Sequence, residues 1–432
     1  MTCEVMLMNL EGVALAADSA VTIIDGRGGH KISQRGVDKV FTLDESAPVG
    51  VMIYGLATFA DFPWKTVLGA FRESRSSDGF DNAAACARSL VAFLAGLDAG
   101  RDGGMAITEK AEAVAFAEYV EGFVDRYATL LAHQGFDEGA GSPSPDMANA
   151  ALRRLRDEIL LDATYLTEGI IKPVADRHER PRTAEPSQRL ASFLAEHLSP
   201  RMDRSLSRYF PKGGLEAVKA PLMTLCAQSV LLEWLPPALP ATGLVIAGFG
   251  RKAHLPSYVN LHVLGAFAGA LQYRYDSAGG PSAGKAPVVF ESYAQDESIV
   301  AFRYGAHNRF MATAYDATTL ALARVFEDMI GLIAAKDPSL AREAASIADR
   351  ALLQTPAIGL TMAMNERESH VARTFGPLLD SASVGVLAAH ATKLVELSIL
   401  EHELTGSGAV GRPISVLKME KGKCRLEKDG KS

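Results

Sequence analysis

The sequence lacks most features that mark secreted, membrane-spanning or nucleic-acid-binding proteins. Its 432 residues include only four cysteines, too few and too dispersed for a disulfide framework or a zinc ribbon. No run of about eighteen apolar residues occurs, so a membrane-spanning helix is not expected. The start of the chain does not read as a secretion signal, because Glu4, Glu11 and Asp18 interrupt its apolar stretch. These absences predict a cytoplasmic protein with no membrane partner.

Excess positive charge is absent as well. The net charge is −7 and the pI is near 5.9, with Lys and Arg scattered along the chain, so no nucleic-acid partner is expected. The ten histidines show no metal-ligand spacing, and "GFGRKA" lacks the full spacing of a dinucleotide-binding loop. We therefore expect no metal and no organic cofactor.

Short apolar runs joined by turn residues predict strands in antiparallel pairs. The runs are 3–10 with 13–17, 38–43 with 48–55, 242–250 with 256–265, a single run 286–294, and 414–419 with 424–428. The polar, glycine-rich stretch "DGRGGHKISQRG" (25–36) predicts a loop, and the apolar spacing from Ala57 onward predicts a helix. Amphipathic helices are expected throughout 80–235, and Ala- and Leu-rich stretches predict further helices at 318–335, 340–354 and 381–404.

This order of elements predicts an α+β fold in which two antiparallel sheets are covered by outer helices. We divide the chain into a first half of the core (1–79), a helical insertion (80–235) and a second half of the core with additional helices (236–432).

Thr2 is the residue with the clearest chemical potential. It becomes the N-terminal residue if Met1 is removed, and a free N-terminal threonine carries a hydroxyl nucleophile and an amine base together. Such a site also needs a cation beside the amine, a carboxylate to orient that cation, and a backbone N–H for the oxyanion. Asp18, Lys39 and Gly55 stand at strand ends that an antiparallel arrangement could bring together.

These residues carry a resemblance to the proteasome β-subunit family of N-terminal-nucleophile (Ntn) hydrolases, including bacterial proteasome homologues. "TCEVMLMNLEGVALAADSAVT" is similar to the family's opening, with sixteen residues from Thr2 to Asp18. "VDKVFTL" resembles the segment with the family lysine, here Lys39, and "PVGVMIYGLATFADF" the strand whose glycine lines the oxyanion hole, here Gly55. "VGRPISVL" near the C-terminus resembles the family's closing strands.

The resemblance implies a four-layer αββα sandwich with a large helical insertion. It implies a threonine peptidase that cleaves peptide or protein substrates with Thr2, Asp18, Lys39 and Gly55, that forms a homo-oligomer, and that could work with an unfoldase or regulator. Two alternatives stay open: a transpeptidase or ligase on the same fold, and a catalytically inactive assembly protein.

Some positions depart from the family pattern. The loop between Asp18 and Lys39 is longer than in typical members, and the family's supporting aspartate and serine after the last long helix have only positional candidates, which are Glu401, His402, Thr405 and Ser407. Cys3 could be considered as a nucleophile, but the spacing to Asp18 fits Thr2, and we interpret Cys3 as a core strand residue.

Overall fold

The computed structural model describes most of the chain. The described residues are 3–24, 31–34, 36–44, 47–75, 79–97, 105–132, 136, 142–168, 188–210, 215–232, 234–236, 239, 241–282, 287–304, 308–406 and 410–428. They form a mixed α+β structure with antiparallel sheets, which confirms the predicted fold class.

The first sheet has the strand order β12–β1–β2–β13–β14. Its strands are β12 (Val289–Ala294), β1 (Cys3–Met8), β2 (Gly12–Ala17), β13 (Ser415–Glu420) and β14 (Lys423–Lys428). All of its pairings are antiparallel. Every residue of β1 and β2 is buried, as the nearly continuous apolar runs predict for strands that are covered on both faces.

The second sheet has the order β11–β10–β9–β6–β5. Its strands are β11 (Ala270–Gly279), β10 (Ser257–Phe267), β9 (Thr242–Gly248), β6 (Val49–Gly55) and β5 (Val40–Asp44). The two sheets face each other across an apolar layer that contains Met6 and Leu15 from the first sheet and Met52 and Val245 from the second.

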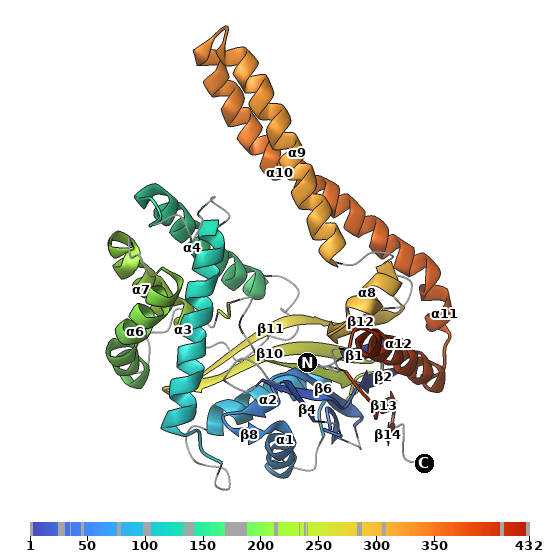
Figure 1. Cartoon of the computed structure of the whole chain (residues 1–432). Helices are drawn as coiled ribbons and strands as arrows, with labels where there is room; N and C mark the ends of the chain where they lie inside the picture. The colour runs from blue at the N-terminus through green and yellow to red at the C-terminus, as the bar shows by residue number, and fades with distance from the viewer. Residues whose placement is uncertain are drawn as a thin grey trace.

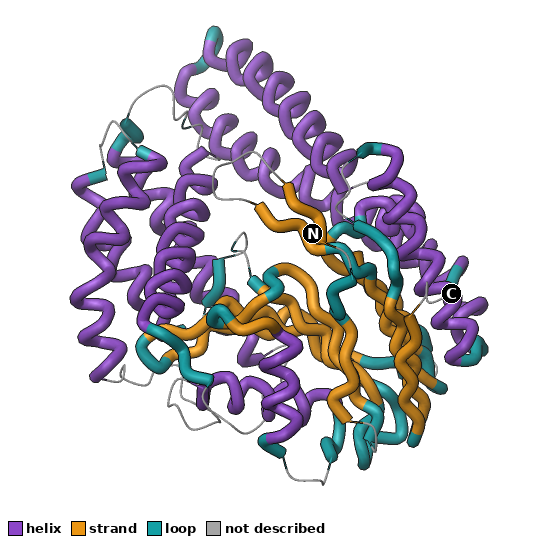
Figure 2. Tube along the Cα trace, turned by 60° about the horizontal axis from the view of Figure 1, so that its bottom comes forward, coloured by secondary structure: helices purple, strands orange, loops and turns teal. Residues whose placement is uncertain are grey.

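Helices cover the outer faces of both sheets (Figures 1 and 2). On the first sheet, α12 (Val384–Leu404) and α8 (Glu297–Tyr304) share a core with β1 and β2. On the second sheet, α1 (Trp64–Glu73) and α2 (Ala83–Gly96) share a core with β6, β9 and β10. The stacking order of these layers is therefore helix, sheet, sheet, helix.

The rest of the predicted insertion builds a helical unit with its own core. Its helices are α3 (Glu109–Ala132), α4 (Pro145–Glu168), α6 (Gln188–Tyr209) and α7 (Glu216–Leu231). Tyr119 and Phe123 are fully buried in this core, and the Tyr119 hydroxyl contacts the Ser229 hydroxyl at 2.7 Å. Phe267 at the end of β10 joins the same core, which anchors the unit to the second sheet.

Two further helices leave the body as a long antiparallel hairpin, which we call the arm (Figure 1). They are α9 (Asn308–Ala334) and α10 (Pro338–Thr374), and the short α11 (Gly376–Asp380) leads from α10 back to α12. At the tip, the Asp337 carboxylate accepts hydrogen bonds from the amides of Ser339 and Leu340 and so caps α10. The sequence predicts these helices but not their projection away from the sheets.

Three local predictions differ from the structure. The segment predicted as a loop contains β4 (Lys31–Gln34), which pairs with β3 (Val21–Ile24). The region after Ala57 first forms the short pair β7 (Thr58–Phe59) and β8 (Phe62–Pro63), and α1 begins only at Trp64. The strand β11 was not predicted, because Arg274 and Asp276 interrupt its apolar pattern.

Candidate functional site

Antiparallel pairing places the predicted site residues at neighbouring strand ends. Cys3 begins β1 and Asp18 follows β2, and the Asp18 amide donates to the Cys3 carbonyl at 3.2 Å. Lys39 immediately precedes β5, and its carbonyl accepts from the Ile53 amide at 2.9 Å, two residues before Gly55. The packing of the two sheets then brings the Asp18 end of the first sheet against the Lys39 end of the second.

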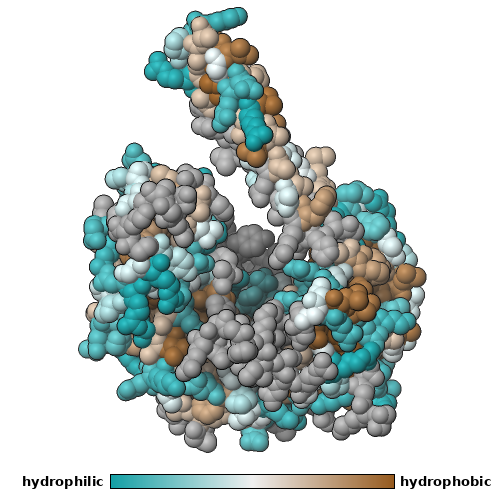
Figure 3. Space-filling model, viewed as in Figure 1, coloured by the Kyte–Doolittle hydropathy of each residue, from teal (hydrophilic) through white to brown (hydrophobic). Residues whose placement is uncertain are grey.

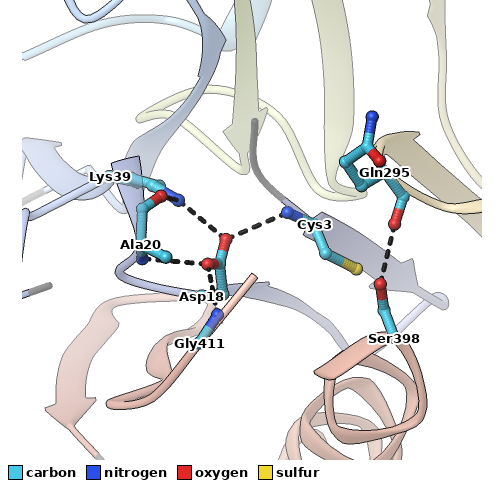
Figure 4. Close-up of polar contacts among 7 residues, drawn as sticks. All are labelled: Cys3, Asp18, Ala20, Lys39, Gln295, Ser398 and Gly411. Atoms are coloured by element: carbon cyan, nitrogen blue, oxygen red, sulfur yellow. Dashed lines mark hydrogen bonds and ion pairs between the residues drawn. The ribbon is translucent and has the colours of Figure 1, made fainter. Parts of the chain in front are cut away.

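Asp18 and Lys39 form a buried ion pair (Figure 4). The Lys39 Nζ lies 2.7 Å from Asp18 Oδ1, and both side chains are almost completely removed from solvent. The Lys39 ammonium also donates to the Ala20 carbonyl. An ammonium group has three N–H donors, and described residues accept hydrogen bonds from two of them.

The same carboxylate binds the start of β1. Asp18 Oδ1 accepts the Cys3 amide at 2.9 Å, so the Lys39 ammonium and the nitrogen of the Thr2–Cys3 peptide bond contact one oxygen atom. Asp18 Oδ2 accepts the amides of Ala20 at 2.9 Å and Gly411 at 3.0 Å. Four donors surround the Asp18 carboxylate, two at each oxygen, and fix its orientation.

Gly411 is a site residue that sequence reasoning did not assign. It belongs to the "VGRPISVL" segment that carries part of the family resemblance, and its carbonyl also accepts the Ser19 amide at 3.0 Å. The closing segment before β13 therefore holds Asp18 at Oδ2, whereas Lys39 contacts Oδ1 (Figure 4).

Gly55 ends β6 in a conformation that requires glycine. Its φ is +80°, and a Cβ at this position would lie 2.1 Å from the Ala241 carbonyl oxygen. The chain just beyond it is held by Thr242, whose hydroxyl donates to the Leu56 carbonyl at 3.0 Å and accepts from the Trp64 indole at 3.0 Å. The backbone around Gly55 is thus fixed from two sides.

A pocket of about 270 Å³ adjoins the Lys39 side of the ion pair and the backbone at Gly55. Lys39 and Gly55 both line it, and Val37, Ile53 and Trp64 contribute apolar walls. At its rim, Asp38 is ion-paired with Lys65 at 3.1 Å and with Lys428. Partial burial alone would raise the pKa of Asp38, but hydrogen bonds from Lys428 and Lys65 lower it overall.

Tyr54 links this pocket to a polar cluster that the sequence did not reveal. Its hydroxyl donates to Asn260 Oδ1 at 3.0 Å and contacts His262 Nε2 at 2.8 Å, and Asn260 in turn donates to Asp276. The Tyr54 ring packs directly against Gly243, where an added Cβ would lie 1.9 Å from a ring atom. Burial raises the pKa of the Tyr54 phenol and lowers that of His262. The cluster therefore presents a neutral phenol beside a half-buried imidazole.

The start of β1 is also held from the α12 side. Ser398 of α12 donates to the Gln295 carbonyl at 2.8 Å and contacts the Cys3 thiol (Figure 4). Burial raises the pKa of that thiol far more than the Ser398 contact lowers it. A buried thiol with a raised pKa is a poor nucleophile, which agrees with the interpretation of Cys3 as a core residue.

Of the four predicted catalytic residues, the structure brings Asp18 and Lys39 into contact and places Gly55 on the same pocket as Lys39. Thr2 and Met1 lie outside the described residues, as does Ser407. Thr405 is exposed at the end of α12 and donates to the Glu401 carbonyl at 3.0 Å. On α12, Ser398 instead contacts Cys3 at the start of β1.

Within the described ranges, no group of three or more His, Cys, Asp or Glu side chains is arranged to hold a metal ion. None of the described helices combines the length and apolarity needed to cross a membrane. No protein-family model, curated protein or solved structure matches the chain.

Proposed function

We propose that the chain is a threonine peptidase of the Ntn-hydrolase class, with a four-layer αββα core and with Thr2 as its nucleophile once Met1 is removed. One observation carries the proposal. Asp18, the acidic member of a buried pair with Lys39, accepts a hydrogen bond from the amide nitrogen that joins Thr2 to the rest of the chain. A salt bridge that only stabilises the fold need not lie beside the first peptide bond of the processed chain. An N-terminal nucleophile, in contrast, requires a cation close to its amine.

In the proposed reaction, the Thr2 Oγ attacks the substrate carbonyl carbon, and the Thr2 α-amine accepts the hydroxyl proton. The Gly55 N–H stabilises the oxyanion of the tetrahedral intermediate. The amine then gives its proton to the leaving nitrogen, the C–N bond breaks, and an ester joins the acyl group to Thr2. Water adds to this ester with the amine again as base, which releases the acid and restores Thr2.

Lys39 and Asp18 have supporting roles in this scheme. The positive charge of Lys39 favours the neutral form of the nearby amine, which must be neutral to act as a base. Asp18 fixes the Lys39 ammonium and, through the Cys3 amide, the peptide bond that follows Thr2. Breaking the pair would therefore affect both the proton transfer and the position of the nucleophile.

The pocket indicates which substrates fit. Its walls include Val37, Ile53, Trp64 and Pro63, and its volume of about 270 Å³ accommodates an apolar side chain. We therefore expect cleavage of peptides with an apolar residue on the acyl side of the scissile bond.

Peptides with a fluorogenic amide leaving group test the proposal. The wild-type chain should release the fluorophore, Thr2→Ala should release none, and Thr2→Ser should keep part of the activity. Cys3→Ala is the matched control, because it removes the neighbouring nucleophile and should leave turnover within a few-fold. Undiminished turnover by Thr2→Ala would contradict the proposal. With an added amine acceptor, a product that carries the acceptor would instead identify a transpeptidase.

A further inference from the structure

The arm exposes apolar side chains that its own two helices do not cover. α9 and α10 meet along a seam in which Leu322, Phe326 and Ile333 are partly buried, opposite the buried Ala341 and Ala348. A solvent-exposed helical hairpin is expected to be polar outside such a seam. Outside this seam, however, several large apolar residues of the arm are at least half exposed. We define the arm face as Val325, Met329, Leu332, Leu340 and Ile347.

The five residues of the arm face lie on one side of the hairpin. Val325, Met329 and Leu332 follow one another at i, i+4 and i+7, about a quarter turn around α9 from its seam. Leu340 and Ile347 are seven residues apart on α10, about a quarter turn from its seam in the same rotational sense. Because the two helices are antiparallel, an equal rotation turns both sets toward the same side. Figure 3 shows apolar side chains along the arm, away from the rest of the body.

The charge of the arm distinguishes between possible occupants. Residues 308–374 contain eight acidic and seven basic side chains. Amphipathic helices that bind anionic lipid carry an excess of Lys and Arg on their polar face, and nucleic-acid-binding helices are basic. The balanced charge of the arm fits neither of these partners and favours another protein surface of mixed charge.

A second copy of this chain satisfies the geometry. The same face on two copies is self-complementary under a twofold axis, and two helical hairpins pack naturally as a four-helix bundle. Five large side chains of this exposure offer on the order of 400 Å² of apolar area per copy. A standard interface buries about 800 Å² per partner, of which somewhat more than half is apolar. The arm face thus supplies the apolar core of such an interface.

We propose that two copies of the chain associate through the arm face to form an intermolecular four-helix bundle. This association is independent of the proposed catalytic chemistry, because the arm contains none of the residues that surround Asp18 and Lys39. The bundle would hold two bodies at opposite ends or sides of a common stalk. It would also protect from water an apolar surface that would otherwise promote aggregation.

Sedimentation velocity of the full-length protein tests this proposal, over about 1–50 µM to bracket typical protein affinities. The wild type should show a concentration-dependent mass of at least two copies. The double substitution Val325→Glu with Met329→Glu should halve the number of copies per particle. Leu320→Glu is the matched control, because Leu320 is equally exposed on the other side of α9 and should leave the mass unchanged.

Ile347→Glu gives a second, independent disruption from α10, and far-UV circular dichroism checks that the helices persist in each variant. A wild type that sediments as a single copy throughout would overturn the proposal. So would folded variants of both helices that keep the wild-type mass.

Discussion

Removing the charge of Asp18 should strongly destabilise the fold. The carboxylate accepts four hydrogen bonds, two at each oxygen, and one donor is the buried Lys39 ammonium. In Asp18→Asn the side chain keeps only one accepting oxygen. Its new N–H₂ group points at two of the four donors, with which it cannot form hydrogen bonds. The ammonium is left buried without its counter-charge, which costs about 3–5 kcal/mol of unfolding free energy.

The partner substitution should cost less. Lys39→Met leaves the carboxylate with three backbone N–H donors, so we expect a loss of about 1–3 kcal/mol. Combining the two substitutions removes both charges, and the double variant should be more stable than Asp18→Asn alone.

Urea unfolding can resolve this order, because the chain has only two tryptophans. Trp64 is buried in the core beneath the second sheet, whereas Trp234 is buried in the separate helical unit. In a Trp234→Phe background, fluorescence reports the sheet core alone. A cost below about 1 kcal/mol for Asp18→Asn, less than one hydrogen bond to a charged group, would show that the buried ammonium does not need this carboxylate. A larger cost for Lys39→Met than for Asp18→Asn would contradict the expected order.

Three further predictions concern the pocket and its surroundings. Gly55→Ala should abolish activity and cost several kcal/mol of unfolding free energy, because it combines a positive φ with a clash against the Ala241 carbonyl. Gly422 is the control, because it has a φ of +78° but open space around it, so Gly422→Ala should cost only about 1 kcal/mol in the same urea assay. Equal costs for the two variants would argue against the clash. Tyr54→Phe should cost about 1–3 kcal/mol by leaving buried polar partners unsatisfied, and an unchanged urea midpoint would show that this hydroxyl is dispensable. Burial lowers the folded-state pKa of His262 below its usual 6.5, so the unfolded chain binds more protons there and stability should fall as the pH drops below about 6.5. His262 contributes at most about 1.4 kcal/mol per pH unit to the pH dependence of the unfolding free energy, and His262→Gln should lose this contribution. An unchanged pH dependence in the variant would show that His262 does not cause it.

The elements that the sequence predicts well are those whose local pattern and burial agree. The runs at 3–10 and 13–17 are apolar throughout and turn at Asn9–Gly12, where the Asn9 side chain accepts the amides of Glu11 and Gly12. The structure buries both strands fully. The contact of Asp18 with Lys39 then follows from two such hairpins whose ends face each other.

The elements that escaped prediction depend on contacts between distant residues. β11 carries Arg274 and Asp276 on the face that bears the polar cluster around Tyr54, so its pattern does not read as a buried strand. Gly411 reaches Asp18 across 393 residues of sequence, and no local pattern encodes that contact. The arm is apolar around more than one side of its helices, which from sequence alone resembles a pair of buried core helices.

The intact mass of the purified protein, before and after reaction with a peptide epoxyketone, tests whether Thr2 is the nucleophile. Such a probe requires a hydroxyl and a free amine on the same residue. We expect a chain that has lost Met1 and gains one probe, with the modification located at Thr2 by fragmentation and absent in Thr2→Ala. Retention of Met1 in the folded protein, or a modification that persists in Thr2→Ala, would contradict this expectation.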